Sequence, residues 1–148
     1  MTSFVLSEVS GWLIAVLAVI TVSLPYLLRG RRLAPQGWGV GYIQRLIPHY
    51  WIGYTIAGLS LLHAGFAMSG PIAPAAGYQL GIWIATGGML LSFGQVSLGL
   101  QLRKLRGEKR LQLRRVHFAV MAGLFAVGAL HLALNGALVQ GLAQLVRI

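Results

Sequence analysis

The sequence predicts an all-α protein: an integral membrane four-helix bundle with both termini outside the cytoplasm (N-out/C-out). The first observation is composition, since the 148 residues have a mean hydropathy of +0.75 and include only 12 basic and 2 acidic residues. The second is three blocks without Asp, Glu, Lys or Arg, at 9–28, 46–102 and 116–146. A membrane-spanning helix needs ~20 predominantly apolar residues, so each block is long enough to cross a bilayer.

The first block predicts a retained helix over 9–28 rather than a cleaved signal peptide. A signal peptide carries positive charge before a short apolar stretch. Here Glu8 precedes the block, and Arg29, Arg31 and Arg32 follow it. Because this order of charges is the reverse of a secretion signal, we expect the segment to remain in the protein as its first span.

The middle block is too long for one crossing, and residues 69–77 (SGPIAPAAG) divide it with two prolines and two glycines. We therefore expect spans over 49–68 and 79–101, and a last span over 116–135, in a single domain of residues 1–148. Pro48 fits a helix start if it is the first helical residue. If the helix began near Tyr42, Pro48 would kink it.

Basic residues determine the expected orientation. The segments 29–48 and 102–115 hold 11 of the 12 basic residues, and four crossings place both segments on one side. The positive-inside rule makes these two loops cytoplasmic, which fits a bacterial inner (cytoplasmic) membrane. The net charge of +10 then reflects topology and anionic lipid headgroups, and we expect no nucleic-acid partner.

The four histidines of the chain form two pairs with one spacing. His49 and His63 stand at positions i and i+14, and so do His117 and His131. This interval advances a helix by about 21 Å in about four turns, so both histidines of a pair project from one face. The second and fourth spans run in the same direction, so His49 should oppose His117 and His63 should oppose His131. Two such couples are the arrangement for two haems, each held between two imidazoles.

Hydrogen bonding between helices is an alternative role for the histidines, although polar groups are costly in hydrocarbon and mark functional sites by default. Zinc or copper also binds imidazole, but the couples are too far apart to share one metal. The chain has no cysteine, which excludes disulfides, thiolate-held iron–sulfur clusters and covalent c-type haem. Its only acids, Glu8 and Glu108, lie outside the spans, so we expect no catalytic residue.

Small and polar residues accompany the histidines on the same faces. Gly53 and Ser60 lie on the histidine face of the second span, and Gly128 and Asn135 on that of the fourth. A flat porphyrin against a helix needs missing side chains at its contact, so we expect these residues to bind the cofactor. Small residues also serve ordinary helix–helix contact in membranes, and that alternative stays open for the glycines.

Three arginines are candidates to pair with the propionates of the cytoplasmic haem. Arg45, Arg114 and Arg115 lie within one turn of His49 or His117. Each of them also serves as a topology signal at the lipid headgroups, so both roles remain open. On the outer side Asn135 is the corresponding polar candidate.

The stretches PHYWIGYTIAGLSLLHAGF (48–66) and RRVHFAVMAGLFAVGALHLALNG (114–136) carry a family resemblance. With two equally spaced histidines on each of two helices, the chain resembles the di-haem b-type cytochromes. These include the cytochrome b of quinol-oxidising complexes, the membrane subunits of hydrogenases and formate dehydrogenases, and ferric-reductase-like domains. The first and third spans resemble the other two helices of a four-helix b-cytochrome core, which carry no haem ligand. The resemblance implies two non-covalent b haems and an electron-carrying subunit of a membrane oxidoreductase complex, with no complete active site of its own.

The expected function is therefore electron transfer across the bilayer between a partner redox subunit and a quinone or another partner. Tyr42–Arg45 with Tyr50 and Trp51 offer hydrogen-bonding groups for a quinone near His49, although tyrosine and tryptophan also gather at membrane interfaces. The basic segment 103–115 is a candidate dock for an acidic partner, or simply a solvated, lipid-contacting loop. The alternative function is a scaffold or pigment subunit whose histidines bind chlorophyll-type macrocycles. A haem or metal transporter would need more polar residues along a path.

Overall fold

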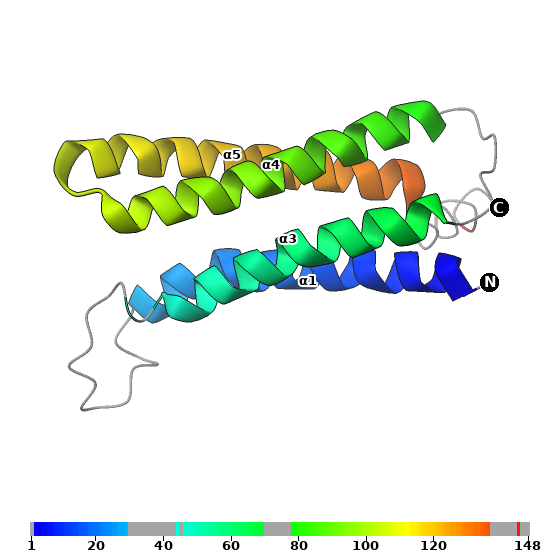
Figure 1. The fold of residues 1–148 in the computed structure, drawn as a ribbon, viewed down its shortest axis with the longest axis horizontal. Coiled ribbons are helices and arrows are strands. Elements are labelled where there is room, and N and C mark those ends of the chain that lie inside the picture. Colours follow the sequence, from blue (N-terminus) through cyan, green and yellow to red (C-terminus); the bar gives the residue numbers. More distant parts are fainter. Residues whose placement is uncertain (1, 30–43, 45, 70–77, 137–144, 146–148) are drawn as a thin grey trace.

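The computed structural model describes residues 2–29, 44, 46–69, 78–136 and 145, and in this part of the chain the fold is all-helical (Figure 1). The long helices are α1 (Thr2–Arg29), α3 (Ile47–Met68), α4 (Tyr78–Lys104) and α5 (Gly107–Asn135). Each is long and apolar enough to cross a membrane. The predicted all-α class and its four candidate spans are thus confirmed at the level of helix length and composition.

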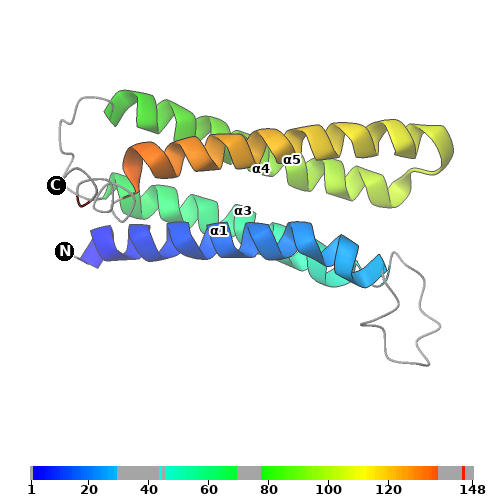
Figure 2. The same cartoon turned by 180° about the vertical axis from the view of Figure 1, so that it is seen from behind.

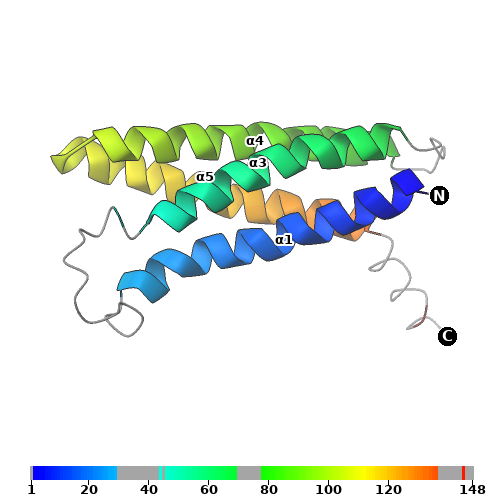
Figure 3. The ribbon, with the colours of Figure 1, turned by 60° about the horizontal axis from the view of Figure 1, so that its bottom comes forward.

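The helices form two antiparallel hairpins that lie side by side. Helix α1 packs along α3, α4 packs along α5, and α3 and α4 join the two hairpins (Figures 1 and 2). Helices α3 and α5 run in the same direction. Figure 3 shows the α4–α5 turn at one end of the bundle and the start of α1 with the end of α5 at the other. This arrangement brings the four histidines, which lie on α3 and α5, into the same bundle at two matching heights.

Two helices extend beyond the predicted membrane spans. Helix α1 begins at Thr2 rather than at Val9, and α5 begins at Gly107 rather than at Val116. The charged start of α5, GEKRLQLRR, consists mostly of strong helix formers, so the helix continues beyond its apolar part. The predicted loop over 102–115 is therefore wrong: only Leu105 and Arg106 separate α4 from α5. Gly107 has φ +62°, a conformation that glycine adopts without strain, and it reverses the chain here.

Helix α3 begins without a kink, which resolves the two readings of Pro48. The helix starts at Ile47 with Pro48 in its first turn, where a missing N–H costs no intrahelical bond. The Tyr50 N–H donates to the Leu46 carbonyl at 3.2 Å. Pro25 differs because it lies inside α1, where its missing N–H does remove a bond.

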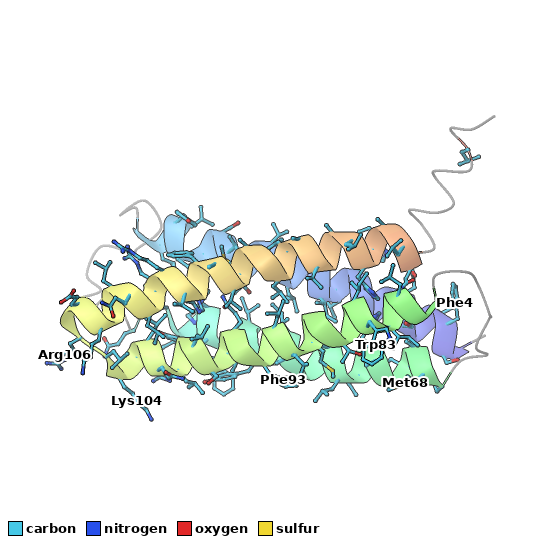
Figure 4. All side chains as sticks on the ribbon, turned by 90° about the horizontal axis from the view of Figure 1, so that it is seen from above. Phe4, Met68, Trp83, Phe93, Lys104 and Arg106 are labelled. Carbon is cyan, nitrogen blue, oxygen red and sulfur yellow. The ribbon has the colours of Figure 1, made fainter. Side chains whose placement is uncertain are left out.

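Apolar side chains of the described residues lie mostly on the outside of the bundle. Ile56 and Ala57 are the buried apolar residues in this part of the chain, whereas Trp83 is 73% exposed. An outward apolar surface of this extent fits lipid rather than water as the surrounding solvent. Figure 4 shows Lys104 and Arg106 at one end of the bundle, and Phe4, Met68 and Trp83 toward the other. Length, hydropathy and surface together indicate a membrane protein.

Candidate functional site

The four histidines meet as two couples, in the pairs expected from their spacing. The ring centroids of His49 and His117 are 6.5 Å apart, and those of His63 and His131 are 6.0 Å apart. When one metal lies between two opposed imidazoles, ~2.0 Å from one nitrogen of each ring, the two ring centroids are about 6.3 Å apart. Both couples therefore have the spacing of two imidazoles that share one metal. The role of the histidines as ligands stays a prediction.

Each histidine of α3 is hydrogen-bonded to a backbone carbonyl of α1. The Nδ1–H of His49 donates to the Thr21 carbonyl at 2.9 Å, and that of His63 donates to the Ser7 carbonyl, also at 2.9 Å. A carbonyl can only accept, so Nδ1 carries the proton in both rings and Nε2 keeps its lone pair. Metal-bound histidines almost always make this second bond, which fixes the tautomer and the ring orientation.

The histidines of α5 have their partners on α4 and on α5 itself. The Gln95 Nε2 donates to the His117 Nε2 at 3.3 Å, and the Asn135 Nδ2 donates to the His131 Nδ1 at 3.2 Å. Within the described part of the chain, His117 Nδ1 and Gln95 Oε1 are buried without a partner, which is costly in an apolar surrounding. Because the Gln95 amide nitrogen can only donate, His117 Nε2 is the accepting nitrogen, and Nδ1 carries the proton of the neutral ring without an acceptor.

The chemistry of the donor set fits a haem better than a bare metal ion. In the described residues no group of three or more His, Cys, Asp or Glu lies close enough to hold a metal. A structural zinc site takes four protein ligands, and a catalytic one takes three. Two facing imidazoles match a metal whose other ligands come from a macrocycle, as in a b haem.

The two predicted glycines, Gly53 and Gly128, stand in open space rather than against another helix. A Cβ added at Gly53 or at Gly128 would meet no atom within 4 Å, although both glycines are half-buried. This finding does not support close helix packing as the reason for these two glycines. Ser60 is half-buried, and its hydroxyl donates to the Ile56 carbonyl of its own helix at 2.9 Å. Its hydrogen bond is therefore local to α3 and does not link the two histidine helices.

The predicted propionate and quinone partners are only partly described. Tyr42, Ile43 and Arg45 lie outside the described residues, and Arg114 and Arg115 are exposed on the early turns of α5. The Tyr50 ring, a candidate for the quinone site, lies under the guanidinium of Arg103, with 5.1 Å between the Arg103 Cζ and the ring centroid. This cation–π contact connects the start of α3 with the end of α4.

The residues that contact the histidines from α1 and α4 were not predicted from the sequence. Helices α1 and α4 supply the Thr21 and Ser7 carbonyls and the Gln95 amide. Backbone carbonyls leave no mark in a sequence. Two signals were present, however: a glutamine in the middle of an uncharged span, and a proline four residues after Thr21.

Comparison with known proteins identifies no family for this chain, since no family model, no curated protein and no solved structure matches it.

Proposed function

We propose that this chain is a membrane electron-transfer subunit that carries two b haems. His49 and His117 hold one haem, and His63 and His131 hold the other. The single observation that supports this function best is the pair of facing imidazole couples, whose centroids lie 6.5 and 6.0 Å apart. A b haem held between two imidazoles exchanges single electrons and has no open position for oxygen or a substrate.

The residues of this chain would hold and orient such cofactors. The two couples are separated by about 21 Å along their helices, given the rise of an α-helix, and this distance spans most of an apolar bilayer core. Gly53 and Gly128 leave room beside the histidines because nothing lies within 4 Å of a Cβ built there. Arg45, Arg114 and Arg115 would neutralise propionates at the cytoplasmic haem, and Asn135 would donate near the outer one.

The orientation that we propose is N-out/C-out in a bacterial inner membrane. The basic end of α4, the start of α5 and the segment 29–48 then lie in the cytoplasm, because the segments 29–48 and 102–115 hold 11 of the 12 basic residues. The His49–His117 couple lies at this basic end, since His117 is close to Arg114 and Arg115 on α5. Electrons would pass between the two faces through the couples.

The electron partners that we propose are another subunit of a redox complex and a quinone or second protein. For a quinone, Gln44 and Tyr50 remain the candidates near His49. Gln44 is exposed, and Tyr50 is half-buried under Arg103. Reduction of the purified protein by a quinol analogue that slows in Gln44→Leu or Tyr50→Phe would support this site. Rapid reduction by a protein donor but never by quinol would exclude it.

An absorption spectrum of the purified full chain, oxidised and then reduced, tests the function. Low-spin b-haem bands that sharpen on reduction, together with a b-type pyridine haemochrome, are the expected result. A chlorophyll-type spectrum without haem would instead support the pigment-binding alternative. A colourless protein that neither retains nor takes up haem would overturn the proposal.

A further inference from the structure

The Thr21 carbonyl of α1 has lost its ordinary helical partner. In an α-helix the carbonyl of residue i accepts from the N–H of residue i+4, and residue i+4 of Thr21 is Pro25, which has no N–H. The His49 Nδ1–H, at 2.9 Å, takes the place of that missing donor. The ring of a helix-interior proline also presses on the carbonyl four residues earlier. Pro25 therefore frees the Thr21 carbonyl from its helical partner and also crowds it.

The Ser7 carbonyl at the other end of α1 is reached in a different way. The Ser10 hydroxyl donates to this carbonyl at 2.9 Å, so the His63 Nδ1–H shares it, and the Ser10 Oγ itself lies 3.2 Å from the His63 Nδ1. What allows the approach is Gly11, because a Cβ at this position would lie only 3.1 Å from the His63 Cε1. A side chain at residue 11 would push the ring away from α1.

The two acceptors have the spacing of the two histidines. Ser7 and Thr21 stand at positions i and i+14 of α1, and His49 and His63 have the same offset on the antiparallel α3. Each carbonyl therefore faces one histidine at the same height. This match gives α1 a role that its apolar composition does not suggest.

We propose that α1 fixes the Nδ1–H tautomer of both α3 histidines, with Pro25 as the positioning residue for His49 and Gly11 as the positioning residue for His63. Because a carbonyl holds the Nδ1–H, the Nε2 lone pair of each ring remains available toward the partner histidine on α5. In water a neutral imidazole prefers the proton on Nε2, so α1 reverses the ordinary preference. The consequence for haem ligation rests on the proposed function, but the tautomer does not.

The test is ¹⁵N-histidine NMR on the haem-free full chain in lipid nanodiscs, with the signals assigned from His49→Gln and His63→Gln. In the wild type both histidines should carry the proton on Nδ1. Pro25→Ala restores an N–H that competes for the Thr21 carbonyl, so the His49 Nδ1–H proton resonance should move upfield while that of His63 stays in place. Gly11→Ala should do the reverse and increase the Nε2–H form of His63. Ser23→Ala is the matched control, because Ser23 is on α1 and donates to the Val19 carbonyl of its own helix.

An Nε2–H tautomer at His49 in the wild type would overturn the proposal, and so would an unchanged His49 resonance in Pro25→Ala. Movement of both histidines in either variant would show a general disturbance of α1 rather than two separate contacts, and would also count against it. If the Gly11→Ala protein does not insert into the membrane, the Pro25→Ala and Ser23→Ala variants alone test the proposal. In haem-loaded protein, Pro25→Ala should raise the midpoint potential of one haem only, because a weaker bond at Nδ1 makes His49 less basic. A chain that shows the Nδ1–H tautomer at both histidines but never binds haem would overturn the proposed function and leave this inference intact.

Discussion

At the scale of single residues, α1 satisfies the Nδ1–H of each α3 imidazole and leaves its Nε2 lone pair for the partner histidine across the bundle. An imidazole in hydrocarbon is costly unless its N–H has an acceptor. His49 and His63 find that acceptor in the α1 backbone, whereas His117 contacts the Gln95 side chain. The two halves of the bundle therefore differ: α1 carbonyl groups accept from the α3 rings, whereas an α4 amide donates to the His117 ring, whose Nδ1 has no partner in the described part of the chain. Of these groups, only the amide belongs to a side chain, so a substitution can remove it.

Gln95→Leu tests the role of this amide. The substitution removes the group that contacts the His117 Nε2 from α4. Loss of such a supporting group typically weakens metal binding about 10–100-fold. We expect haem to dissociate faster from the His49–His117 couple only, as followed by transfer to apomyoglobin. Gln101→Leu is the control, since Gln101 is exposed on the same helix and contacts Ser97 instead. Equal haem loss in both variants would contradict a specific role for Gln95.

At the scale of helices, hydropathy and histidine spacing were enough to predict four spans and the facing of the couples. Helix ends were not predictable from the same signals. A charged stretch such as Gly107–Arg115 stops a membrane span but not a helix, because helix propensity does not depend on the bilayer. The contribution of α1 was hidden for another reason: the acceptors are the Ser7 and Thr21 carbonyls, and every residue possesses a carbonyl. The packing of α3 against α1 and of α5 against α4 belongs to the tertiary structure. It decides which group each imidazole contacts.

Gly128→Leu tests whether the open space beside a histidine serves a cofactor. Nothing lies within 4 Å of a Cβ at Gly128, so the variant should fold. Leucine is also a better helix former than glycine, which is about 0.8–1.0 kcal/mol less favourable than alanine in a helix. We expect a thermal stability at least as high as that of the haem-free wild type, but loss of one of two haems in the spectrum. Gly58→Leu is the matched control, because Gly58 is also open but exposed on α3. Full haem content in Gly128→Leu would mean that the space faces lipid.

At the scale of the whole molecule, the bundle has one strongly basic end. Four exposed basic residues lie around the short α4–α5 turn: Arg103, Lys104, Arg106 and Lys109. Figure 4 shows Lys104 and Arg106 at this end. Arg103 differs from the others because it stacks on Tyr50 of α3, a contact worth about 0.5–1 kcal/mol at an exposed site. The other three residues have no such structural role in the described part of the chain.

Topology can be tested without background labelling because the chain has no cysteine. Ser69 lies at the end of α3 and Lys109 in the first turn of α5, and both are exposed at opposite ends of the bundle. We expect a membrane-impermeant maleimide to label Ser69→Cys in intact spheroplasts, and to label Lys109→Cys only after the membrane is permeabilised. The opposite pattern would reverse the orientation that we propose.

Neutralising the basic end tests docking of a partner. We expect Lys104→Gln, Arg106→Gln and Lys109→Gln together to reduce co-purification of a redox subunit and to slow haem reduction by it, more strongly at low salt. Arg103 is left unchanged so that the contact with Tyr50 persists. The charge-conserving set Lys104→Arg, Arg106→Lys and Lys109→Arg should assemble normally. If the neutral set also assembles and accepts electrons normally, these charges serve lipid contact and topology.

The most direct test of the central claim is the number of haems per chain, measured by pyridine haemochrome against quantitative amino-acid analysis. The two imidazole couples predict two haems in the wild type and one in either His63→Ala or His131→Ala. The remaining haem should keep its spectrum, because the His49–His117 couple is about 21 Å away along the helices. A single haem in the wild type would contradict the claim, and so would loss of both haems from a single histidine variant that remains folded.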